Sequence, residues 1–216
     1  MIYFYFIVVP AIIGVAVFLL SSYGRGLIGL VLTRALIGSN KPKKSKYVVR
    51  NLIFKHDNRT IKIDYLIIDP LGVHVIEVLN MKGTIFGREN DLEWTISVDH
   101  GLTKNKFYSP VKKNSGHIAA LKDELKIDAM FFSYVVFTNR SSIAIKTHHV
   151  TVEFPLAFIQ EYRDKQIEHP LEHEYLESIY NAVLELKKNN TISKKQYKEL
   201  AELESKEAKK IKTKKA

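Results

Sequence analysis

Two carboxylates on neighbouring predicted strands are the side chains of this sequence best suited to chemistry. Asp64 lies within an apolar, β-branched run from Thr60 to Asp69, and Glu77 lies within a second such run from Gly72 to Asn80. Runs of this composition predict β-strands, and a two-residue connection between them predicts an antiparallel hairpin. The chemistry depends on how this hairpin pairs the two acids.

The register of the hairpin can be predicted from its short connection. If the last residue of the first strand faces the first residue of the second, Asp64 lies opposite Glu77 and Lys62 lies opposite Leu79, all on one face. Directly opposed Cβ atoms are about 5 Å apart, where two carboxylates repel each other unless a cation or a proton lies between them. Because apolar residues flank both acids, Asp64 and Glu77 are predicted to bind a divalent metal ion. The alternative is that one carboxylate is exposed to solvent at the end of the sheet.

Several motifs around these acids are similar to those of a known family. They are an I-D before an apolar strand, G-V-x-V-I-E on the return strand, K-G-x-I-x-G after it, a Trp about seventeen residues beyond the Glu, and a Pro-led helix with His and Leu. The stretches IDYLIIDPLGVHVIEVLNMKGTIFG, Glu93-Trp94 and YSPVKKNSGHIAAL carry them. Over roughly residues 24–165 the chain resembles the nuclease-related domain, NERD, a branch of the PD-(D/E)xK nuclease superfamily. The resemblance implies a restriction-endonuclease-like α/β fold, with a central mixed β-sheet flanked by helices, and Mg²⁺-dependent phosphodiester cleavage in its ancestry.

The resemblance also implies roles for individual residues. The family's catalytic Asp and Glu match Asp64 and Glu77, so the metal pair is intact. The family's lysine, two positions after the Glu, falls on Leu79, which can neither orient an attacking water nor stabilise charge on a phosphate. The family's Gln after the Pro falls on Lys113, and the acidic residue of its G-x-x-G-E helix start falls on Leu30.

Lys62 and Lys113 are the candidates for the cation that Leu79 removes. Lys62 is predicted to lie across the hairpin from Leu79, so the hypothesis is that Lys62, together with Lys113, preserves weak cleavage. The function expected is therefore a nuclease-like domain that binds nucleic acid, with DNA the expected ligand, and whose metal-dependent cleavage is weak or lost. The alternative is a non-catalytic membrane scaffold that uses the same fold to recruit a protein partner.

The first part of the chain predicts a membrane anchor. From Ile2 to Leu20 there are nineteen residues without a charge, and about 20 apolar residues span a hydrocarbon core of ~30 Å. The basic residues near this run all follow it: Arg25, Arg34, Lys41, Lys43, Lys44 and Lys46. Because positive flanks stay on the cytoplasmic side, we expect a single-pass protein of the cell membrane, with its N-terminus outside and its C-terminal domain in the cytoplasm.

The remaining elements suggest how the chain is divided. Residues 27–38 suit a short helix that packs on the domain, 131–139 and 149–154 suit strands of the sheet, and 155–200 suit covering helices.

Four segments follow from this pattern. They are an anchor over residues 1–23, a NERD-like domain over 24–165, a helical extension over 166–204 and a basic tail over 205–216.

Composition limits the function classes. Lys and Arg number 33 against 23 Asp and Glu, a formal charge of +10, which favours nucleic acid or anionic membrane lipids as partners. The chain has no cysteine, so a disulfide, a thiolate metal site and a Cys nucleophile are excluded. A zinc site among four histidines is not expected: His148 and His149 are strand neighbours that point to opposite faces, and His169 and His173 flank Pro170 at a helix start.

Overall fold

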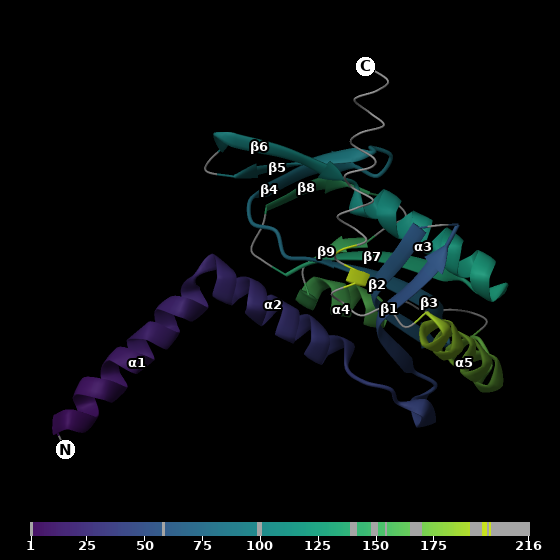
Figure 1. The fold of residues 1–216 in the computed structure, drawn as a ribbon, viewed down its shortest axis with the longest axis horizontal. Helices are drawn as coiled ribbons and strands as arrows, with labels where there is room; N and C mark the ends of the chain where they lie inside the picture. Colours follow the sequence, from purple (N-terminus) through teal and green to yellow (C-terminus); the bar gives the residue numbers. More distant parts are fainter. Residues whose placement is uncertain are drawn as a thin grey trace.

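The computed structural model describes residues 2–57, 59–98, 101–138, 142–147, 151–153, 155–164, 170–190, 196, 197 and 199. The basic tail and His148, His149 and His169 lie outside these residues. Within the described part, the chain is a mixed α/β structure with two sheets and helices packed around them (Figure 1).

The larger sheet is the mixed sheet that the sequence predicts. Its five strands follow the order β1-β2-β3-β7-β9. The pairs β1–β2 and β2–β3 are antiparallel, whereas β3–β7 and β7–β9 are parallel. Their bounds are β1 Tyr47–His56, β2 Arg59–Asp69, β3 Gly72–Leu79, β7 Phe131–Phe137 and β9 Thr151–Glu153.

A second mixed sheet, of four strands in the order β6-β5-β4-β8, was not predicted. The bounds are β4 Thr84–Arg88, β5 Glu93–Val98, β6 Thr103–Tyr108 and β8 Ser142–Lys146. An apolar cluster joins the sheets: Ile85 and Trp94 of the second sheet pack with Val135 and Phe137 of β7 and with Val111.

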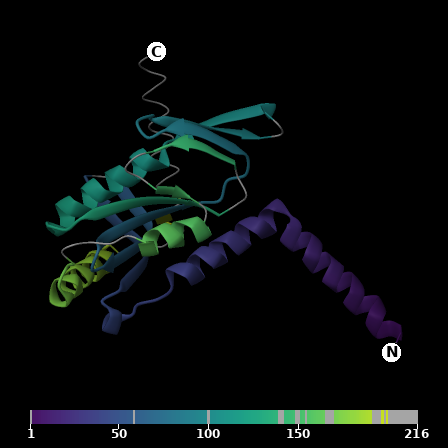
Figure 2. The same cartoon turned by 180° about the vertical axis from the view of Figure 1, so that it is seen from behind.

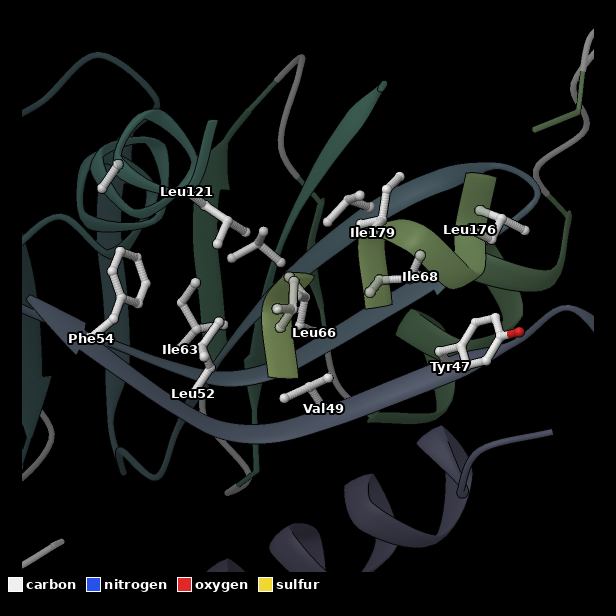
Figure 3. Close-up of a cluster of buried hydrophobic side chains, with 14 residues drawn as sticks. Tyr47, Val49, Leu52, Phe54, Ile63, Leu66, Ile68, Leu121, Leu176 and Ile179 are labelled. Carbon is white, nitrogen blue, oxygen red and sulfur yellow. The ribbon is translucent and has the colours of Figure 1, made fainter. Parts of the chain in front are cut away.

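Helices cover both faces of the larger sheet. On one face lie α3 (Pro110–Leu125) and α5 (His173–Asn189). Figure 3 shows their side chains, Leu121 of α3 and Leu176 and Ile179 of α5, together with Leu66 and Ile68 of β2 in one apolar cluster. Because α5 buries residues at helical spacing in the same core as β1 and β2, the helical extension is packed into the domain.

The other face carries α2 (Ser22–Ile37) and α4 (Pro155–Asp164), which lie side by side in front of the sheet in Figure 2. Ile37 of α2 and Phe158 of α4 pack with Ile67 of β2 and Tyr134 of β7. The prediction that this first short helix packs on the domain is therefore confirmed.

Two glycines let α2 approach the sheet closely. A Cβ at Gly29 would lie 1.9 Å from the carbonyl oxygen of Thr138, and one at Gly26 would lie 2.3 Å from the Asn80 side chain. Thr33 on the same face is buried and donates to the Gly29 carbonyl. This close contact fixes α2 beside the ends of β3 and β7.

The helix α1 (Ile2–Leu20) projects away from the domain (Figures 1 and 2). Among the described residues, no one helix has both the length and the apolar composition for a membrane span, so the single transmembrane helix expected from the sequence is not found as such. Helices over Val8–Leu20 and Tyr23–Ile37 meet those requirements only as a pair, bent by 74°. The bend falls at Ser21, whose hydroxyl donates to the Phe18 carbonyl and accepts the N–H of Gly24, and so begins a new helix.

Candidate functional site

The predicted hairpin register is confirmed over most of its length. The β2–β3 ladder begins with Asp69 facing Gly72 and runs to Tyr65 facing Ile76. Asp64 and Glu77 occupy the next position, where the ladder has ended.

Instead of pairing through its backbone, Asp64 uses its side chain. Its Oδ2 accepts the backbone N–H of Val78 at 3.0 Å, so the carboxylate lies between the diverging strands. The predicted pairing of Lys62 with Leu79 is wrong, because Lys62 lies beyond the end of this ladder and pairs with Ile53 of β1.

The ladder between β2 and its other neighbour, β1, is also interrupted at Asp64. The β1–β2 ladder pairs Arg50 with Tyr65 and Leu52 with Ile63, and omits Asn51 and Asp64 between them. Asn51 has a φ of 49°, a left-handed conformation that asparagine adopts more readily than most residues. Asp64 therefore sits where both ladders break, an arrangement that frees its side chain from the regular alternation of the sheet.

The structure brings all four predicted site residues together. Lys62 Nζ donates to Asp64 Oδ1, and Lys113 Nζ donates to Glu77 Oε1 at 2.5 Å. Glu77 also interacts electrostatically with Asp64 and Lys62. The two lysines expected to supply a cation thus each hold one carboxylate.

Glu77 is the more deeply placed of the two acids. Its side chain is 5% exposed against 17% for Asp64, and that of its partner Lys113 is 39% exposed. Burial raises the pKa of Glu77 above its ordinary value; Lys113 acts against this rise, and the charge of Asp64 adds to it. Glu77 therefore depends on a neighbouring cation to remain ionised.

Leu79 occupies the position of the family's lysine, and its surroundings are apolar. Its side chain packs against the apolar cluster that includes Ile85, Trp94 and Phe137. An ammonium group in this position would lose these apolar contacts of a half-buried side chain.

His117 interacts electrostatically with three residues of the site, Lys113, Asp64 and Lys62. It lies one helical turn beyond Lys113 on α3, is 6% exposed, and its Nδ1 has no hydrogen-bond partner among the described residues. Burial and then the charge of Lys113 lower the pKa of His117 to about 4. The imidazole is consequently neutral at pH 7.

A pocket of about 300 Å³ opens beside Asp64. Leu30, Val31 and Arg34 of α2 form one wall. Asn51, Asp64, Tyr65 and Val78 of the sheet form the other. Sequence reasoning missed the roles of Arg34 and Asn51 because only the docking of α2 and the distortion at Asn51 bring them to Asp64.

Asp64 and Glu77 are the residues that could hold a divalent metal. Two carboxylates supplemented by water suit Mg²⁺, which keeps several waters in protein sites. No group of three His, Asp or Glu side chains in the described residues is arranged to bind a metal. The donor set thus fits a hydrated Mg²⁺ or Mn²⁺ better than a fully protein-coordinated ion, provided the two ammonium groups give way.

A mixed α/β fold that carries two adjacent carboxylates at diverging strands fits a nuclease-like class of protein. The model of the nuclease-related domain, NERD, matches residues 25–138, which is more than half of the 216-residue chain. The chain therefore belongs to the NERD family. An uncharacterised protein of Bacillus anthracis, pXO1-01, is 26% identical over 167 residues, covering 74% of this chain and 76% of that protein. No solved structure matches the chain.

Proposed function

We propose that this protein binds nucleic acid, with DNA the expected ligand, through a nuclease-like domain in which metal-dependent phosphodiester cleavage is weak or lost. The observation that carries the proposal is the Asp64–Glu77 site. The acids expected of a nuclease are present, but each is held by a lysine, and an apolar residue stands at position 79. Binding without efficient turnover is the function that this combination supports best.

The residues of the site suggest what chemistry could remain. Asp64 and Glu77 would hold Mg²⁺ or Mn²⁺, which supplies a Lewis acid and lowers the pKa of a bound water. Lys62 and Lys113 would then turn from the carboxylates toward the substrate phosphate. Neutral His117 has one donor and one acceptor nitrogen, so it could donate a single hydrogen bond to a phosphate oxygen without adding positive charge.

We also propose that α1 enters the cell membrane, with the domain on the cytoplasmic side. The support is the apolar surface of α1, on which Ile12, Val17 and Leu20 are each more than 60% exposed with nothing in the described chain covering them. Contiguous apolar exposure of this kind is characteristic of membrane or protein contact. The lysines after α2 then lie where anionic headgroups would attract them, each by about 1 kcal/mol.

Nucleic-acid binding is tested with the full-length chain in neutral detergent. We expect a labelled DNA oligonucleotide to bind with an affinity that falls as salt rises, with a log–log slope of about −0.7 per phosphate contact for single strands and about −0.9 for duplex. Fluorescence anisotropy at several salt concentrations measures the slope. Binding to anionic vesicles without any binding to DNA would refute the proposal and favour the alternative, a membrane scaffold.

Metal binding gives a second expected result. Isothermal titration of Mn²⁺ should show binding that tightens as pH rises from acid to neutral, because burial raises the pKa of Glu77 and a proton competes for the carboxylate. Asp64→Asn should remove this binding, whereas Asp91→Asn, at an acid on the loop between β4 and β5, should leave it unchanged. Equal Mn²⁺ heats for wild type and Asp64→Asn would contradict the metal site.

A further inference from the structure

We infer that the pocket between α2 and β2 is a phosphodiester-binding subsite in which Arg34 contacts the phosphate of a nucleic-acid strand. The inference rests on the proposed nucleic-acid function and names a contact that this function requires. It is carried by the position of Arg34, by the charges around it and by the shape of the pocket.

The position of Arg34 is fixed by the docking of α2. Leu30 and Arg34 are one helical turn apart and line the same wall of the pocket, opposite Asp64. The adjacent face of the helix is held by Gly29 against Thr138 at the end of β7, and Thr33 on that face is buried. Because that contact leaves no room for even a Cβ at Gly29, α2 presents Arg34 to Asp64 from a rigid support.

The charges around the pocket leave Arg34 available. Lys62 and Lys113 are engaged by Asp64 and Glu77, and Arg50 donates to the Gly38 carbonyl. In the described part of the chain, no ion pair engages Arg34, and α2 has no acidic residue that could neutralise it at helical spacing.

The positive charges of Arg34 and Arg50 both act on Tyr65, which lines the pocket. Burial raises the pKa of Tyr65, and the positive charges of Arg50 and Arg34 act against that rise. Two guanidinium groups therefore act on the same side chain of the pocket. Guanidinium is well suited to this role, because its planar N–H groups match the geometry of a phosphate.

The pocket also suits the rest of a nucleotide. Its volume of about 300 Å³ lies at the lower end of the range for small-ligand sites. Leu30, Val31 and Val78 contribute apolar surface to its walls, and Asn51 and Arg34 contribute polar groups. A sugar or base can pack on the first while the phosphate meets the second, next to the carboxylate of Asp64.

The test compares two arginines that differ in position only. Arg34→Gln removes the charge in the pocket, and Arg59→Gln removes one at the exposed start of β2, about 17 Å along the strand from Asp64 at 3.3 Å per residue. In the full-length chain, we expect Arg34→Gln to weaken binding of a single-stranded oligonucleotide about tenfold at low salt and to make the salt slope shallower by about 0.7. Arg59→Gln should change neither by as much, and Arg34→Lys should retain the slope.

The results distinguish a failure of the proposed phosphodiester subsite from a failure of the proposed nucleic-acid binding. Wild-type binding with equal losses in Arg34→Gln and Arg59→Gln would overturn the subsite and leave the proposed function standing. Failure of the wild type to bind any oligonucleotide would overturn both. Urea unfolding followed by the fluorescence of buried Trp94 checks that the variants are folded.

A competition experiment identifies the source of the phosphodiester. A dinucleoside monophosphate should displace the labelled oligonucleotide at lower concentration than glycerophosphoglycerol, the soluble headgroup of an anionic lipid. The reverse order would assign the pocket to a lipid headgroup and overturn its assignment to nucleic acid.

Discussion

Lys113→Met should lower the free energy of unfolding at pH 7 by about 2–3 kcal/mol, because it leaves the buried carboxylate of Glu77 without its hydrogen-bonded cation. This loss of unfolding free energy is no larger than is usual when one partner of a buried ion pair is removed. Lys113 is partly exposed, and Lys62 still acts on Glu77 in the variant. Burial already raises the pKa of Glu77, and removing Lys113 raises it further. Stability is then lost as pH rises through that pKa, so the effect of the substitution should be smaller in acid.

The partner substitution provides the control. Glu77→Gln should cost less than Lys113→Met, because the lysine can turn its ammonium group to water whereas the carboxylate cannot. The double variant should recover most of the loss of Lys113→Met. Urea titrations of full-length protein in neutral detergent, followed by Trp94 fluorescence, measure all three. Additive effects of the two substitutions would show that the pair is not energetically coupled.

His117 should make the fold sensitive to mild acid. Its pKa is about 4 in the folded chain, against about 6.5 when unfolded. The unfolded chain therefore binds the additional proton between these values, so stability is complete above about pH 6.5 and is lost as pH falls toward 4. A shift of about 2.5 pH units corresponds to a loss on the order of 3 kcal/mol. His117→Gln should flatten the stability curve over this interval.

A second histidine should respond in the opposite direction. A hydrogen bond to Glu124 raises the pKa of His56, against the effect of desolvation, so its stabilising contribution is lost as pH rises. His56→Gln should consequently remove stability from the acid side, where His117→Gln restores it. If the difference between wild type and His117→Gln does not change with pH, the imidazole is not buried in its neutral form.

The parts of the site that depend on local sequence could be predicted. A two-residue connection between β-branched runs was enough to set the hairpin register, and that register put Asp64 and Glu77 at adjacent positions. The covering helices also followed from helical spacing, whereas the central mixed sheet was implied by the family resemblance that the motifs carry.

The parts of the site and fold that depend on distant contacts could not be predicted from the sequence. The register implied that the hairpin continues to Lys62, but the left-handed Asn51 and the hydrogen bond of Asp64 to Val78 interrupt it. Neither event has a local sequence signal, because asparagine is also common in turns. The second sheet requires the parallel pairing of β4 with β8, which are more than fifty residues apart, and the spacing of apolar residues does not report such pairings.

The joint between α1 and α2 has a mechanical consequence. The rings of Phe18 and Tyr23 are in edge contact across it, and Gly24 lies close against the Phe18 carbonyl. The two helices are therefore closely packed where they meet. At its other end, α2 is a wall of the pocket that contains Asp64. A force that tilts α1 would thus be transmitted along α2 to the wall of this pocket.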